Sequence, residues 1–136
     1  MGAGLIKGCF DVHVVVSDIE KSLQFWSRTM GFQIEEVVDL PGGNKQFRLR
    51  NGNALVKLMI RGEHPLAPLF DADGYRGLTL AISNFDETVE ACRKSGSRIL
   101  LEPRPSFAHP DSGKLICVLQ DPEGNIVELE SAADGA

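Results

Sequence analysis

The sequence lacks clustered basic residues and long apolar runs, and each absence excludes a class of partner. Phosphate binding depends on clustered Lys and Arg, so the scattered basic residues and the formal charge of -5 argue against nucleic acid. No apolar run approaches the length that spans a bilayer, and the start of the chain lacks the features of a signal peptide. We therefore expect a cytoplasmic protein that binds small molecules and has no membrane partner.

Cysteine is also scarce. Cys9, Cys92 and Cys117 are an odd number at wide spacing, which suits neither a disulfide framework nor a zinc site. We expect all three to be reduced thiols. At 136 residues, of which 43% are hydrophobic, the chain can fill one core and is too short for two ordinary domains.

Two stretches of the chain follow the same plan. Alternation over residues 10–16 predicts a strand, after which Ser17 is placed to cap a helix that ends at Gly31. Residues 77–82 repeat the strand, and Ser83 is placed to cap a second helix that ends at Gly96. The two halves therefore indicate a duplicated unit whose sheets enclose one cleft.

Strands account for most of the remaining sequence. They are predicted at 33–38, 45–50, 54–61, 98–101, 114–120 and 125–130, with a turn at 121–124. Each half then has the order βαβββ, which is an α+β fold. The expected organisation is one domain with a module at 8–61, a linker at 62–74, a module at 75–131 and a tail at 132–136.

Three motifs carry a family resemblance. They are Ser-Asp-Ile-Glu-Lys-Ser-Leu-Gln-Phe-Trp from position 17, Met-Gly-Phe from position 30, and Asp-Pro-Glu-Gly-Asn-Ile-Val-Glu-Leu from position 121. With these motifs the chain resembles the vicinal oxygen chelate superfamily, which includes glyoxalase I, extradiol dioxygenases, methylmalonyl-CoA epimerase and bleomycin resistance proteins. The resemblance implies paired βαβββ modules that form an open barrel-like cleft, usually in a homodimer. It does not fix one reaction, because this fold supports many.

Strand alternation separates apolar faces, expected to pack under the helices, from polar faces. The residues on the polar faces, which in the similar fold look inward on the cleft, are Asp11, His13, Arg48, Lys57, Thr79 and Glu128. Loops at 62–74 and 102–113 add aromatic and imidazole groups. The predicted ligand-binding residues are Arg48, Thr79, Tyr75, Phe107 and His109.

The resemblance implies metal ligands at four positions, here occupied by Asp11, Gly77, Lys57 and Glu128. Glycine has no side chain, and a charged lysine has no lone pair. Only Asp11 and Glu128 could ligate, with His13 as a displaced third ligand. We expect no cofactor; the alternative is one divalent metal (Fe, Mn, Zn or Ni) bound by these three residues.

Without a metal, the same residues suit proton abstraction next to a carbonyl. Asp11, Glu128 or His13 could take the proton, and Lys57 with Arg48 could stabilise the enolate-like charge. The predicted function is a small-molecule isomerase, epimerase or lyase that uses general acid/base chemistry. Lys57 and Glu128 could instead form a structural ion pair that replaces the metal.

Two other functions stay open. One is non-catalytic binding of a small molecule or antibiotic, as in proteins similar to the bleomycin resistance proteins. The other is a divalent-metal enzyme of the lactoylglutathione lyase or dioxygenase type with an atypical site.

Overall fold

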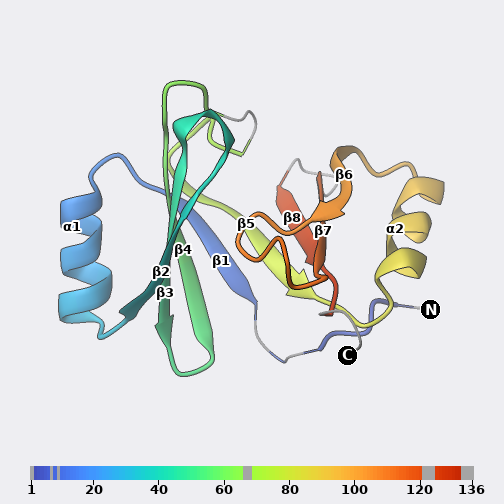
Figure 1. Cartoon of the computed structure of the whole chain (residues 1–136), viewed down its shortest axis with the longest axis horizontal. Coiled ribbons are helices and arrows are strands. Elements are labelled where there is room, and N and C mark those ends of the chain that lie inside the picture. Colours follow the sequence, from blue (N-terminus) through green and yellow to red (C-terminus); the bar gives the residue numbers. More distant parts are fainter. Residues whose placement is uncertain (1, 7, 9, 66–68, 121–124, 133–136) are drawn as a thin grey trace. The chain divides into compact units, whose positions relative to one another are not determined.

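The computed structural model describes residues 2–6, 8, 10–65, 69–120 and 125–132 (Figure 1). The chain divides into two compact units, which we call the first unit (residues 11–76) and the second unit (residues 1–10 and 77–136). Each unit has its own apolar core. The turn predicted at 121–124 lies outside the described residues.

The first unit is a four-stranded sheet with one helix. Its elements are β1 (Asp11–Val15), α1 (Ile19–Leu23) continued by the π-helix η1 (Gln24–Thr29), β2 (Gln33–Asp39), the short 3-10 turn η2 (Pro41–Gly43), β3 (Lys45–Asn51) and β4 (Ala54–Ile60). The strand order is β2-β3-β4-β1, in which β1 runs parallel to β4 and the other pairs are antiparallel.

The second unit repeats this plan. Its elements are β5 (Gly74–Ala81), which begins at the end of the first unit, α2 (Phe85–Lys94), β6 (Ile99–Pro105), β7 (Leu115–Gln120) and β8 (Ile126–Glu130). The strand order is β5-β8-β7-β6, with β5 parallel to β8. The predicted α+β class and the two βαβββ sequences are therefore confirmed.

Both helices begin one residue later than predicted. Asp18, not Ser17, is the N-cap of α1, because its Oδ1 accepts a hydrogen bond from Lys21 N at 3.1 Å. Asn84 occupies the N-cap of α2 without capping it. Its Oδ1 accepts instead from Gly4 N at 2.7 Å, which ties the N-terminal segment to this helix.

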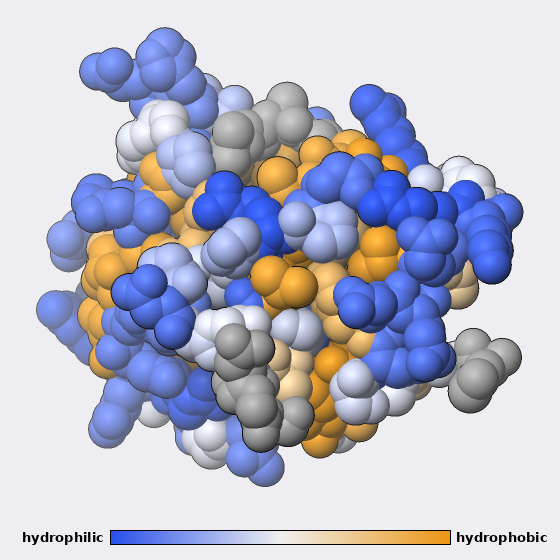
Figure 2. Space-filling model, turned by 45° about the vertical axis from the view of Figure 1, so that its right-hand side comes forward, coloured by the Kyte–Doolittle hydropathy of each residue, from blue (hydrophilic) through white to orange (hydrophobic). Residues whose placement is uncertain are grey.

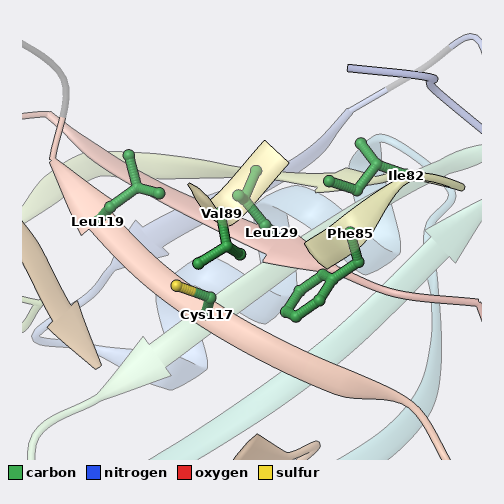
Figure 3. Close-up of a cluster of buried hydrophobic side chains, with 6 residues drawn as sticks. All are labelled: Ile82, Phe85, Val89, Cys117, Leu119 and Leu129. Carbon is green, nitrogen blue, oxygen red and sulfur yellow. The ribbon is translucent and has the colours of Figure 1, made fainter. Parts of the chain in front are cut away.

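The predicted apolar faces do pack under the helices. In the first unit Val14, Leu49, Val56 and Leu58 form a buried cluster. Ile19, Leu23 and Trp26 pack against it, whereas Met30, the C-cap of the π-helix, is exposed. Figure 3 shows the matching cluster of the second unit, which consists of Ile82, Phe85, Val89, Cys117, Leu119 and Leu129.

Two of the three cysteines lie among the described residues. Cys92 and Cys117 are free thiols, and burial raises the pKa of the Cys117 thiol to about 11. Cys9 lies outside the described residues. Among the described residues no helix is long and apolar enough to cross a membrane. In Figure 2 hydrophilic side chains alternate with smaller hydrophobic areas on the face in view.

Candidate functional site

The side of the first unit's sheet away from α1 carries one continuous row of ionisable side chains. Strand register places His13 beside Lys57, Lys57 beside Arg48, and Arg48 beside Glu36, so the row crosses all four strands. Side chains that are directly opposite on one face lie close enough to interact. We call these four residues the charged row.

Three members of the charged row are almost fully buried. His13 is 1% exposed, Lys57 2% and Arg48 8%. Burial lowers the pKa of the His13 imidazole well below its ordinary value, and the positive charges of Lys57 and Arg48 lower it further. His13 is therefore a neutral imidazole at pH 7, with Lys57 on the neighbouring strand and Arg48 on the strand after it.

Arg48 is oriented by its neighbours on the same face. Its Nη1 donates to Gln46 Oε1 at 3.0 Å, and its Nε lies 3.5 Å from Glu36 Oε1. Gln46 is fixed in turn, because its Nε2 donates to Met59 Sδ at 3.6 Å. The guanidinium is thus held in one position rather than left to rotate.

Gln46 and Glu36 were not among the predicted site residues. Gln46 was detectable, because it precedes Arg48 by two residues on a strand and therefore shares its face. Glu36 was not. Simple alternation puts it on the face of Ile34, but an irregularity between Ile34 and Glu36 turns it toward Arg48.

Asp11 lies on the same face as His13 but in a different cross-strand row. It is buried, and its register partner is Leu55 rather than Lys57. Of the predicted catalytic residues, the first unit therefore places His13 and Lys57 side by side, with Asp11 two residues before His13 on β1.

The second unit contains two further predicted residues as direct neighbours. Thr79 on β5 and Glu128 on β8 are register partners, and Thr79 is fully buried. The registers make the two units comparable position by position. Thr79 corresponds to His13, and Glu128 corresponds to Lys57.

Of the three remaining predicted residues, Tyr75 lies near the start of β5 and is 72% exposed. Phe107 and His109 lie between β6 and β7. The guanidinium of Arg104 lies 4.0 Å from the ring centre of Phe107. His109 belongs to a loop closed by serine hydroxyls, since its N–H donates to Ser106 Oγ at 3.1 Å and its carbonyl accepts from Ser112 Oγ at 2.7 Å. Ligand binding by Tyr75, Phe107 and His109 stays a prediction.

The residues at the expected metal-ligand positions do not fit a metal. Gly77, the counterpart of Asp11, can hold no side chain because an added Cβ would overlap the Ile126 carbonyl and lie 2.7 Å from Ile126 Cβ. At a second position the donor is an ammonium group, Lys57. Over the described part of the chain, no three His, Cys, Asp or Glu residues are grouped to hold an ion.

The close approach at Gly77 makes its replacement costly. We expect Gly77→Ala to lower the free energy of unfolding by about 1 to 3 kcal/mol, because β5 and β8 must separate to admit the methyl group. Urea denaturation of both proteins measures this loss. Gly8→Ala is the control, since an added Cβ there has no neighbour within 4 Å. Equal stability of Gly77→Ala and wild type would contradict the close approach.

Comparison with known proteins identifies the family. The family model described as the Glyoxalase/Bleomycin resistance protein/Dioxygenase superfamily matches residues 10–129. The chain belongs to this superfamily. The resemblance predicted from its motifs is therefore confirmed.

Individual relatives differ in activity. The chain is 30% identical to the human mitochondrial methylmalonyl-CoA epimerase over 129 residues, which cover 89% of this chain and 72% of that protein. It is 26% identical to a probable lactoylglutathione lyase of Synechocystis sp. over 121 residues, covering 84% and 87%. The solved structure of methylmalonyl-CoA epimerase from Mycobacterium tuberculosis shares the fold, with a TM-score of 0.76, 18% identity, and coverage of 98% and 93%. The predicted homodimer stays a prediction.

Proposed function

We propose that the protein catalyses proton transfer at a carbon next to a carbonyl group of a small molecule, by general acid/base chemistry and without a metal. The observation that carries the proposal is the neutral, buried imidazole of His13 beside the ammonium of Lys57 and the guanidinium of Arg48. The epimerase and lyase relatives support the same reaction class.

Each member of this set has a chemical role in the proposal. His13 accepts the proton from carbon and becomes an imidazolium, while the C–H electron pair moves into an enolate. Lys57 and Arg48 stabilise the enolate oxygen, and Gln46 holds the guanidinium in place. When the imidazolium exchanges its proton with solvent before reprotonating the same carbon, the result is isotope exchange. Reprotonation of the opposite face of the enolate, with Asp11 as the proton donor, gives epimerisation, and protonation of a neighbouring atom gives an isomer.

The low pKa of His13 suits a base of this kind. It keeps the imidazole unprotonated at neutral pH. The two cations that disfavour a lone imidazolium also favour the enolate that forms with it, so the charge change is balanced within the charged row. Asp11, buried on the same face, is the second candidate base.

Hydrogen–deuterium exchange at carbon tests the proposal directly. We expect the protein in D2O to replace protons next to the carbonyl of pyruvate, 2-oxobutanoate or methylmalonyl-CoA faster than a protein-free blank, as measured by 1H NMR. We also expect EDTA to leave the rate unchanged within about twofold, because no step passes through a metal. A rate abolished by EDTA and restored by one added divalent ion would favour the metal enzyme.

The competing binding function gives a different result in the same samples. A compound that receives saturation transfer from the protein, yet exchanges no proton, would favour a non-catalytic binding protein. Exchange no faster than the blank for every compound would contradict the proposed catalysis.

A further inference from the structure

An apolar cluster borders the charged row on the same face of the first unit's sheet. Val15 and Met59 are register partners, two residues beyond His13 and Lys57 on β1 and β4. Phe70 completes this buried cluster and is 1% exposed. Because a strand advances about 3.3 Å per residue, the cluster begins roughly 7 Å from the His13–Lys57 pair. We call Val15, Met59 and Phe70 the apolar wall.

Phe70 reaches this position from a segment that the sequence indicated as a linker. Leu69, the residue before Phe70, and Leu40 pack around the same cluster. Connecting segments usually run over the protein surface and are more mobile than the strands they join. The near-complete burial of Phe70 beside the charged row therefore requires a structural cause.

Arg61 supplies that cause. It follows Met59 by two residues and therefore continues the same face just beyond β4. Its Nε donates to the carbonyl of Phe70 at 2.6 Å, and its Nη1 donates to Asp73 Oδ1 at 2.7 Å. One guanidinium thus binds the main chain at Phe70 and the side chain of Asp73, three residues further on.

A second ion pair joins the residue after Phe70 to β5, since Arg76 Nη2 lies 2.5 Å from Asp71 Oδ1. Residues 70–76 are therefore held by two contacts from Arg61 and one from Arg76. The ring of Phe70 is held by the main chain as well as by its packing. A side chain held in this way acts as a fixed boundary rather than an adaptable one.

We infer that Phe70 determines substrate size, because the apolar wall limits the alkyl group carried by the reacting carbon. The inference rests on the proposed function, since it takes His13 as the position of that carbon. A methylene group that an apolar site cannot accept lowers binding or turnover about 10-fold or more. The substrate class that fits is a carbonyl compound with a short alkyl substituent.

Binding of a homologous series tests this inference without any need for turnover. Pyruvate, 2-oxobutanoate, 2-oxopentanoate and 2-oxohexanoate are titrated into wild type, Phe70→Ala and Phe70→Leu, and Kd is measured by NMR. For wild type we expect Kd to rise at least about tenfold from 2-oxobutanoate to 2-oxohexanoate. Phe70→Ala should abolish that rise, and Phe70→Leu should reduce it.

Two controls keep the result interpretable. Phe25→Ala removes the same side chain from a half-exposed site on η1, and it should leave the chain-length dependence unchanged. Phe70→Leu keeps the apolar cluster filled, so it carries the test if Phe70→Ala does not fold.

The outcomes separate the size limit from the proposed catalysis. An equal chain-length dependence in wild type and both Phe70 variants, or no binding of any acid to any of these proteins, would overturn the role of Phe70. If wild type exchanges protons but the variants keep its size dependence, only the inference fails. If binding follows the predicted sizes but no proton exchanges, only the proposed catalysis fails.

Discussion

Replacement of His13 by glutamine is expected to slow proton exchange next to the substrate carbonyl by about 10²- to 10⁴-fold, the range typical for loss of a general base. Glutamine keeps a polar side chain of similar reach but cannot accept the proton. The neighbouring cations stay in place, so substrate affinity should change much less than the rate. The measurement is the exchange rate by 1H NMR at saturating substrate, together with Kd.

The pH dependence of the rate gives an independent signature of this base. His13 is active when neutral, and its pKa is lowered below the ordinary value of 6.5 by burial and by the charges of Lys57 and Arg48. The rate should therefore stay level as the pH falls through 6.5, and should decline only when the pH reaches the lowered pKa. A rate that halves near pH 6.5 would assign the base to an unperturbed group.

A matched histidine provides the control for this experiment. His64 is exposed in the segment after β4, and His64→Gln should keep the wild-type rate and the wild-type pH profile. A His13→Gln protein that folds normally and exchanges within about threefold of wild type would contradict the assignment. In that case Asp11 becomes the leading candidate for the base.

Much of this site follows from strand alternation. The shared face of His13, Lys57 and Arg48 could be predicted, because side chains on a strand alternate strictly and the three strands are regular. The correspondence between Lys57 and Glu128 could also be predicted, since each lies on the last strand of its half. Faces and equivalences are local or repeated properties of the chain.

The parts that could not be predicted depend on irregular backbone or distant contacts. Glu36 joins the charged row because of an irregularity in β2 that no residue pattern predicts. Phe70 enters the apolar wall because Arg61 binds its carbonyl, which is a contact between a side chain and the main chain nine residues away. Asn84 fails to cap α2 because the N-terminal segment uses its side chain.

Duplication and divergence therefore act on different features of the two units. The βαβββ order and the apolar clusters are kept, because each sheet must bury one face under a helix. The polar residues at corresponding positions differ between the two units. His13 corresponds to Thr79 and Asp11 to Gly77, so the chemistry that we propose is concentrated in the first unit.

Replacement of Asn44 by alanine is expected to lower the free energy of unfolding by roughly 2 to 4 kcal/mol, because three hydrogen bonds at a fully buried site are lost together. Asn44 Nδ2 donates to the carbonyls of Pro41 and His64 at 2.7 and 3.2 Å. Its Oδ1 accepts from Gly62 N at 2.8 Å. Alanine would leave the partly buried Gly62 N–H without this acceptor.

The geometry around Asn44 allows no substitute. Gly42 and Gly43 have φ near +80°, and a Cβ on Gly42 would overlap the His64 carbonyl, so the turn and the segment after β4 lie in direct contact. Aspartate at 44 would keep the bond from Gly62 N but turn a negative oxygen toward two carbonyls. Asn44→Asp should therefore be at least as destabilising as Asn44→Ala at pH 7.

Asn51, an exposed asparagine, is the control that distinguishes loss of this hydrogen-bond network from the general effect of removing a side-chain amide. Asn51 donates one hydrogen bond to the Met30 carbonyl at 3.2 Å, and Asn51→Ala should change stability by at most about 0.5 kcal/mol. Urea denaturation compares the variants. Because Leu40 beside this turn packs on the apolar wall, Asn44→Ala should also weaken the size limit set by Phe70. Wild-type stability of Asn44→Ala would contradict the role of the network in holding this part of the site.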